Sequence, residues 1–450
     1  WTYRLPSVLG FFCSMIFFYF YFKKIETPIV VFTSVFFLTI SLLTISEIHQ
    51  SKTDALLFLF ITICNLILYK TVKFNKINKL EVYIFWICIA LGILTKGPII
   101  IIFTLIPLLL FSIIKKRNLF GLVWSLVPFL IFLLISIPWF VLINIKSEGI
   151  FWHESIGNDF FNKIKSGQES HGFPPGYYSI LIFIFFWPAS IFFFNFLKDI
   201  KSKFSNIFKT NDYKLFLMIS FLLPFFIFEL IPTKLPHYVY PCYLPLSILI
   251  SKFIMDKNFN ELELNSSIIS LILYPVIITG LICYAVYEYH IIDSTLLFVI
   301  IFNISFLILL LVLRLKKNIK KVMLFSGLYQ LSVYLTLVFF LIPRMDKLWI
   351  SQKIANIINE NEKKFDHVFT LGFNEPSLLF LTSHLSLNDI SFNDLTSEDI
   401  NNKNILFIMT PVNSRKMESR IKFKNFNLIE EFEGFNYSKG KKIKFQIYHN

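Results

Sequence analysis

Long apolar runs alternate with short polar turns along the first 344 residues of the chain. About twelve of these runs have the length that a helix rising about 1.5 Å per residue needs to cross a hydrocarbon core of about 30 Å. They lie near 5–22, 28–46, 54–70, 81–95, 98–114, 122–144, 178–197, 215–232, 238–253, 266–287, 294–313 and 322–343. The pattern predicts a polytopic α-helical membrane protein.

The pattern changes after Pro343. The stretch from Ile350 to Lys363 has the spacing of an amphipathic helix, and two short apolar runs have the character of buried strands. These runs are 367–373 and 404–410, and 426–434 with 442–449 predicts a hairpin around a Ser-Lys-Gly turn. We therefore expect a transmembrane domain over 1–344, with a polar loop at 145–177, and a small α/β domain over 345–450.

The composition agrees with a membrane protein, and the positive charge does not require a nucleic-acid partner to explain it. The chain is 55% hydrophobic and has a formal charge of +14. Residues 1–344 hold 29 basic and 16 acidic side chains, whereas 345–450 hold 14 and 13. The excess lies in the membrane part, where short basic loops set the topology among membrane lipids. The five cysteines all lie in or beside apolar runs, so neither a disulfide nor a thiolate metal site is expected.

The lysines and arginines predict the orientation. One set of loops holds 21 of them, and the opposite set holds 6 apart from Arg4. The positive-inside rule places the richer set in the cytoplasm. The chain start, the loop 145–177 and the domain 345–450 then lie on the outer side.

Two outer turns carry charged residues beside apolar helices. Asp54 opens the span that begins ALLFLF, where a carboxylate either caps the helix or faces an outer cavity. Lys96 precedes Gly97-Pro98, where a lysine either snorkels to the interface or meets an anionic lipid head group.

The outer turn PTKLPHY (232–238) holds three hydrogen-bond donors: Lys234, His237 and Tyr238. All three residue types can donate to phosphate oxygens. Glu229 lies about one turn deeper and is expected to pair with Lys234 or another cation.

The loop 145–177 contains Glu154 and His171, whose side chains suit a divalent ion such as Zn²⁺ or Mg²⁺. No tight HxxxH or HxxE spacing supports that site, and the alternative is a surface helix followed by a rigid turn. The sequence also has no DxD, P-loop or GxSxG motif. An activated donor on the outer face would therefore have to arrive on a lipid.

The motifs taken together resemble one family. RLPSVLG, KTDALLFLF, GILTKGP, GQESHGFPPGYY and PTKLPHYVYP occur in the order seen in bacterial membrane glycosyltransferases of the aminoarabinose-transferase and protein O-mannosyltransferase superfamily, which have the GT-C architecture. The resemblance covers essentially all of residues 1–345. It implies about thirteen spans in the full protein and an outer α/β tail.

The resemblance also implies an activity: transfer of a sugar from a polyprenyl phosphate to lipid A, lipopolysaccharide or protein on the outer face of the inner membrane. By motif, Asp54 matches the acidic residue that opens the span after the second outer turn, and it is the candidate catalytic residue in this chain. Lys96 matches the lysine of TKGP, and Lys234 and Tyr238 match the KLPHY turn, whose tyrosine lies near the lipid phosphate. With His237 they are the candidate lipid-phosphate ligands. His171 matches a metal or structural position.

The family pattern starts earlier than this chain. Its members have a first span and an outer loop with an Asp-Glu motif, which supplies the main catalytic carboxylate. RLPSVLG normally follows that loop, but only Trp1-Thr2-Tyr3 precede it here. We therefore expect this chain by itself to be inactive. A flippase for lipid-linked sugars would instead predict inverted repeats and mid-membrane charges, and a non-catalytic scaffold is a third reading.

Overall fold

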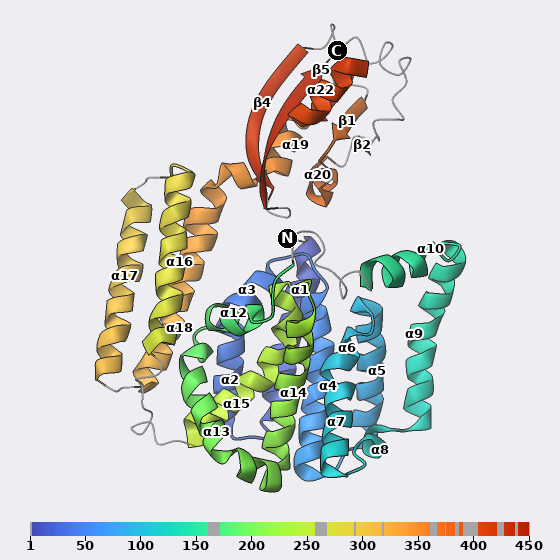
Figure 1. Cartoon of the computed structure of the whole chain (residues 1–450), viewed down its shortest axis with the longest axis vertical. Coiled ribbons are helices and arrows are strands. Elements are labelled where there is room, and N and C mark those ends of the chain that lie inside the picture. The colour runs from blue at the N-terminus through green and yellow to red at the C-terminus, as the bar shows by residue number, and fades with distance from the viewer. Residues whose placement is uncertain are drawn as a thin grey trace. The chain divides into compact units, whose positions relative to one another are not determined.

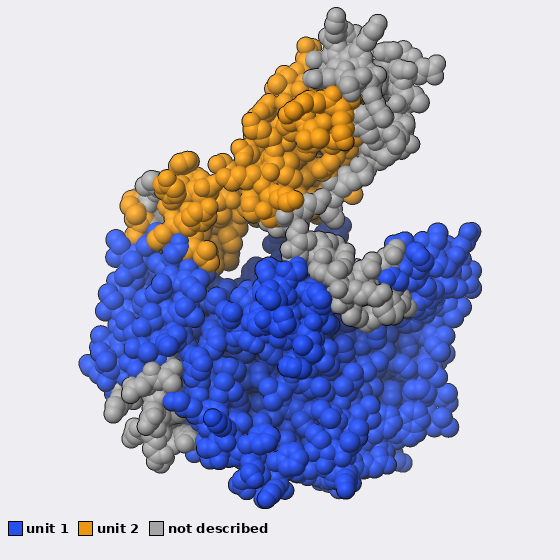
Figure 2. All heavy atoms as spheres, viewed as in Figure 1, with its two compact units in different colours: residues 1–280, 300–334 blue, residues 281–299, 335–450 orange. Residues whose placement is uncertain are grey.

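The computed structural model describes residues 2–160, 172–256, 268–291, 294–316, 319–360, 367–373, 375–382, 387–389, 404–420, 427–436 and 440–449. The chain forms two compact units, one of residues 1–280 and 300–334 and the other of residues 281–299 and 335–450 (Figure 2).

The first unit is built from helices (Figure 1). They are α1 (Leu5–Phe22), α2 (Pro28–Ile40), α3 (Leu42–Ile48), α4 (Asp54–Phe74), α5 (Lys79–Lys96), α6 (Ile99–Phe103), α7 (Leu105–Lys115), α8 (Phe120–Val123), α9 (Leu126–Lys146), α10 (Ile150–Trp152), α12 (Tyr177–Phe185), α13 (Phe193–Thr210), α14 (Asp212–Leu230) and α15 (Tyr243–Asp256). A π-helix, η2, covers His153–Phe160, and 3₁₀ helices cover Ala189–Phe192 (η3) and Pro236–Cys242 (η4). The residues of α16 (Ile268–Glu288), α17 (Ser294–Leu315) and α18 (Ile319–Leu335) are divided between the two units.

Each predicted apolar run has a helix at its place. Among the described residues, seven helices are long and apolar enough to cross a membrane, or up to nine if each of two bent helix pairs is one span. The prediction of a multi-pass helical membrane protein is thus confirmed. The number of about twelve spans stays a prediction.

Two predicted runs are bent rather than straight. The run 178–197 breaks between α12 and α13, whose directions differ by 116°. Pro188 lies in this break, and proline has no N–H to continue a helix and restricts the residue before it. The run 28–46 bends by 62° between α2 and α3. The Ser41 hydroxyl there donates to Thr44 Oγ1 at 2.8 Å, a local bond that competes with helix continuation.

Close backbone packing holds α1 against α4. Gly10 lies where a Cβ atom would stand 3.0 Å from Leu56 Cα and 3.1 Å from Ala55 O. Helix α4 also packs against α5, α14 and η4, so it is the centre of this unit. Phe58 of α4 stacks on Tyr240 of η4 with ring centroids 4.4 Å apart. These contacts fix the ends of α4 and η4 relative to each other, which positions the site below.

The second unit ends in a five-stranded sheet of order β2-β1-β3-β5-β4. Its elements are η7 (Ile342–Arg344), η8 (Asp346–Leu348), α19 (Ile350–Glu360), β1 (His367–Leu371), α20 (Pro376–Leu381), β2 (Leu387–Asp389), β3 (Ile405–Met409), α22 (Pro411–Arg420), β4 (Asn427–Asn436) and β5 (Lys441–His449), after the π-helix η6 (Thr336–Leu341). Strand β1 pairs in parallel with β2 and β3, while β5 is antiparallel to β3 and β4.

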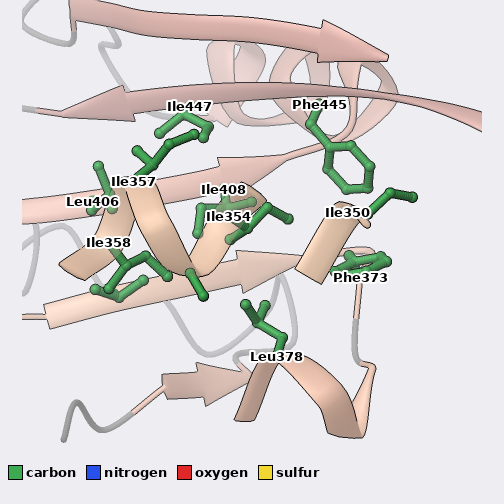
Figure 3. Packing of buried hydrophobic residues seen from close by; sticks show 12 residues of the cluster. Ile350, Ile354, Ile357, Ile358, Phe373, Leu378, Leu406, Ile408, Phe445 and Ile447 are labelled. Atoms are coloured by element: carbon green, nitrogen blue, oxygen red, sulfur yellow. The ribbon is translucent and has the colours of Figure 1, made fainter. Parts of the chain in front are cut away.

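The core of the sheet lies mainly under α19. Ile350, Ile354 and Ile358 of α19 pack on β-strand residues such as Leu406 and Ile447 (Figure 3). Helix α22 contributes Met417 to a smaller cluster with β1 and β3 residues. The predicted amphipathic helix, both buried strands and the hairpin are confirmed. Residues 361–363 and 437–439, which the predicted helix and turn included, lie outside the described residues.

Candidate functional site

Four segments of the first unit bring charged and aromatic side chains to one place. The cluster consists of Glu47 at the end of α3, Asp54 at the start of α4, Lys96 at the end of α5, and His237 with Tyr238 in η4. We call these five residues the polar cluster. The segments around Asp54, around Lys96 and around His237 are three of the turns that were expected on the outer side.

Asp54 and Lys96 form an ion pair, with Lys96 Nζ 2.5 Å from Asp54 Oδ1. The N-cap position of α4 is Thr53, so the Asp54 carboxylate lies within the first turn and is turned to the lysine. The helix dipole favours both charges, an anion at the start of α4 and a cation at the end of α5. The Lys96 side chain is 25% exposed and that of Asp54 10%, so a ligand can reach the lysine. Gly97, with φ +70°, turns the chain away just after Lys96.

His237 lies between two carboxylates. Its Nδ1 is 4.0 Å from Glu47 Oε1 and its Nε2 is 4.0 Å from Asp54 Oδ1. The rings of His237 and Tyr238 meet edge to face at 4.9 Å, and Lys96 Nζ lies 5.9 Å from the centre of the Tyr238 ring. Lys96, His237 and Tyr238 therefore lie together, while their role as a phosphate site stays a prediction.

Glu47 was not predicted as a site residue. It belongs to the polar stretch EIHQSKTD (47–54), which ends at Asp54, but no spacing separates Glu47 from its neighbours. In the structure Glu47 is only 3% exposed, because α3 packs against η4. Burial of one acidic residue in a polar turn depends on the bend between α2 and α3, so the sequence pattern gave no signal for it.

Lys234 has a different environment from the one expected. It is fully buried, and its ammonium donates to the carbonyl oxygens of Glu229 and Ile231, each at 2.6 Å, and of Phe228 at 3.4 Å. These carbonyls belong to the last turn of α14, whose oxygens have no partner within the helix. The contacts give Lys234 the role of a C-terminal cap in the described structure.

Glu229 pairs with backbone rather than primarily with a cation. Its carboxylate accepts hydrogen bonds from the N–H groups of Tyr178 and Ser179, at 3.2 and 3.1 Å, and from Ser179 Oγ at 2.9 Å. It thereby satisfies free donors at the N-terminus of α12. The Tyr178 hydroxyl donates to Leu235 O at 3.1 Å. The turn that carries His237 and Tyr238 is thus fastened to α12 and α14.

Of the two predicted metal residues, the structure describes Glu154 but not His171. Glu154 is exposed, and its carboxylate lies 3.5 Å from His153 Nδ1. His171 lies outside the described residues. Within the described ranges no group of three His, Cys, Asp or Glu side chains could hold a metal ion. Two neighbouring side chains are fewer than the three protein ligands of a catalytic zinc site, so the metal stays a prediction.

Comparisons with known sequences agree with the motif resemblance. Residues 1–142 match the model of the dolichyl-phosphate-mannose-protein mannosyltransferase family. The undecaprenyl phosphate-alpha-4-amino-4-deoxy-L-arabinose arabinosyl transferase of Photorhabdus laumondii is 26% identical over 176 residues, which cover 38% of this chain and 30% of that protein. A second such transferase of Pseudomonas fluorescens is 30% identical over 171 residues, 37% of this chain and 28% of the relative. The aligned part thus spans about a third of these curated relatives.

Solved structures agree over a longer range. The crystal structure of ArnT from Cupriavidus metallidurans bound to undecaprenyl phosphate matches with a TM-score of 0.73 and 13% sequence identity, covering 99% of this chain and 84% of that one. The apo structure of the same protein matches with a TM-score of 0.71. The predicted fold class is confirmed. This chain is thus similar to two aminoarabinose transferases in sequence over 37–38% of its length, and to ArnT of Cupriavidus metallidurans in fold over 99% of it.

Proposed function

We propose that the protein is a glycosyltransferase that moves a sugar from a polyprenyl-phosphate donor to an acceptor of the lipid A or lipopolysaccharide type, or to a protein. The observation that carries the proposal is the polar cluster, in which two cations or potential cations, two carboxylates and a tyrosine meet at one end of a membrane helix bundle. The likeness in fold to a protein crystallised with undecaprenyl phosphate supports it.

In this proposal the donor phosphate binds at Lys96, His237 and Tyr238. Lys96 is the most accessible charge of its pair, and both Tyr238 and a protonated His237 can donate to phosphate oxygens. Asp54 holds the lysine at 2.5 Å, so the lysine is already positioned before the donor arrives. Lys234 stays a prediction as a fourth phosphate ligand, since its ammonium is engaged by three carbonyl oxygens.

The chemistry would be a single displacement. The acceptor oxygen attacks the anomeric carbon, the bond from that carbon to the phosphate oxygen breaks, and polyprenyl phosphate leaves with the electron pair. A carboxylate takes the acceptor proton; Asp54 is the candidate that the sequence motif supplies in this chain. Lys96 and His237 would stabilise the negative charge that grows on the phosphate, and such a contact is typically worth about 3–4 kcal/mol. One displacement inverts the configuration at the anomeric carbon.

The proposed location follows from the lysine distribution. By the positive-inside rule, we propose that the polar cluster, the loop 145–177 and the domain 345–450 lie on the periplasmic side of the bacterial inner membrane.

The test is a transfer assay with the protein expressed from its whole open reading frame. Polyprenyl phosphates carrying aminoarabinose or a hexose are incubated with lipid A or an acceptor protein, and the product is analysed by mass spectrometry and by the NMR coupling of the anomeric proton. Transfer with inversion supports the proposal. Binding or movement of the donor across vesicles without any glycosylated product would overturn it.

A further inference from the structure

Glu47 is a buried carboxylate that the proposed phosphate site does not use. It is 3% exposed, its Oε2 has no hydrogen-bond partner within the part of the chain that the structure describes, and its Oε1 lies 4.0 Å from His237 Nδ1. Removing a carboxylate from water without a partner is costly, so such a group calls for a physical reason. The nearest described cationic candidate in the polar cluster is the ring of His237.

The two ring nitrogens of His237 face one carboxylate each, Glu47 through Nδ1 and Asp54 through Nε2, both at 4.0 Å. A neutral imidazole carries one N–H, whereas the imidazolium carries two donors. Only the protonated ring therefore matches both carboxylates. A shift of about 1 Å would bring either pair within hydrogen-bond distance.

The charges of the polar cluster also favour the protonated form of His237. When Glu47 and Asp54 are both ionised and Lys96 is charged, the three side chains carry a net charge of −1, which a protonated His237 neutralises. With a neutral His237 the cluster is negative in sum and repels a phosphate. With a protonated His237 it has two cations, and Lys96 is the more exposed of them.

We propose that Glu47 is a positioning residue that keeps His237 protonated and oriented, so that His237 presents a second cation beside Lys96 to the donor phosphate. This inference rests on the proposed function, because it concerns the same phosphate site. Glu47 itself would touch neither the phosphate nor the sugar. It acts through the imidazole.

Other charged and titratable groups around the pair are Lys52, Asp54, Lys96, Tyr238 and Tyr240. Tyr240 is engaged with Thr44, whose Oγ1 donates to its hydroxyl at 3.2 Å. Of the two carboxylates against His237, removal of Glu47 leaves Asp54, which already holds Lys96.

The experiment measures binding of undecaprenyl phosphate to the purified full chain in detergent between pH 5.5 and 8.5. The variants are Glu47→Gln, Glu47→Asp, His237→Gln and the double variant Glu47→Gln/His237→Gln. Glu148→Gln, an exposed residue after α9, is the matched control for loss of a glutamate charge. Melting temperature and gel-filtration profile show whether each variant is folded.

Glu47→Gln is expected to bind undecaprenyl phosphate within about twofold of wild type at pH 5.5 and about tenfold more weakly at pH 8. The reason is that the His237 ring of this variant loses its proton at a lower pH than the ring of wild type. A tenfold change in affinity corresponds to about 1.4 kcal/mol. Glu47→Asp is expected to restore part of the binding at pH 8. His237→Gln is expected to bind weakly without this pH dependence, and the double variant should behave like it.

Three results would overturn the inference. A Glu47→Gln profile parallel to wild type would mean that Glu47 has no influence on the charge of His237. Additive losses in the double variant would mean that the two residues act separately. If wild type bound no undecaprenyl phosphate at any pH, the proposed function would fail first and the inference with it, so the two failures are distinguishable.

Discussion

Replacing Lys96 by methionine separates a lysine that binds phosphate from one that only completes an ion pair. Methionine keeps an unbranched apolar side chain and removes the charge. Lys96 Nζ contacts Asp54 at 2.5 Å, and its side chain is 25% exposed. The substitution therefore removes both the pair and the accessible cation of the polar cluster.

The two roles predict different magnitudes. A partly exposed pair lies between surface pairs, worth about 0–1 kcal/mol, and buried pairs, whose breakage costs about 3–5 kcal/mol. We therefore expect Lys96→Met to reduce the free energy of unfolding by about 1–2 kcal/mol. As a phosphate contact in the transition state, the same lysine is worth about 3–4 kcal/mol, or about 10²–10³ in kcat/KM.

The double variant Asp54→Asn/Lys96→Met distinguishes them. It removes the carboxylate that Lys96→Met leaves unpaired, so thermal melting in detergent should return most of the way to wild type. Binding of undecaprenyl phosphate, which does not need the Asp54 carboxylate as a base, should stay at the low level of the single variant. Lys146→Met, an exposed lysine at the end of α9, controls for loss of a positive charge.

The reasoning would be refuted if the double variant regained both stability and undecaprenyl phosphate binding. Lys96 would then serve only to neutralise Asp54. It would also be refuted if Lys96→Met lost stability but kept its kcat/KM within a factor of about three, since a phosphate contact is worth far more than that.

Three further predictions concern positions away from the transfer step. Lys234→Met should lower the melting temperature by leaving three carbonyl oxygens without their donor, whereas unchanged melting with lost donor binding would restore its predicted phosphate role. Gly10→Ala should destabilise the protein by about 1–3 kcal/mol, because a Cβ meets backbone at 3.0 Å, while Gly280→Ala, with open space around it, should not. Burial raises the pKa of Glu26, but hydrogen bonds from Lys252 and Lys73 outweigh it and hold this pKa below its ordinary value of 4.5. The loss of stability in Glu26→Gln should therefore be complete above pH 4.5 and should disappear as the pH falls below it. Melting curves from pH 7 to 3 measure this loss. A difference in melting temperature between wild type and variant that stays constant with pH would contradict the prediction.

The sequence predicted the architecture well because hydrophobic periodicity reports burial and length. The α19 helix, the strands around Phe369 and Phe407, and the places of the long helices were readable from apolar spacing. The bends were not, since the break after Phe185 depends on Pro188 within a run that is apolar throughout. Apolar content alone does not distinguish a straight span from a bent one.

The site was predictable in part for a similar reason. Asp54, Lys96, His237 and Tyr238 stand in short motifs, and the structure brings them together. The buried role of Lys234 depends on the way α14 ends, and the burial of Glu47 depends on the packing of α3 on η4. Neither is a property of local sequence, because both arise from contacts between segments far apart in the chain.

The most direct measurement is equilibrium binding of undecaprenyl phosphate, compared with the corresponding polyprenol without the phosphate, to the wild-type chain and to Lys96→Met. The account predicts that wild type prefers the phosphate at least tenfold, about 1.4 kcal/mol, and that Lys96→Met loses this preference while binding the alcohol unchanged. Equal binding of the two lipids by wild type, or a preference that Lys96→Met keeps, would contradict the claim that the polar cluster is a lipid-phosphate site.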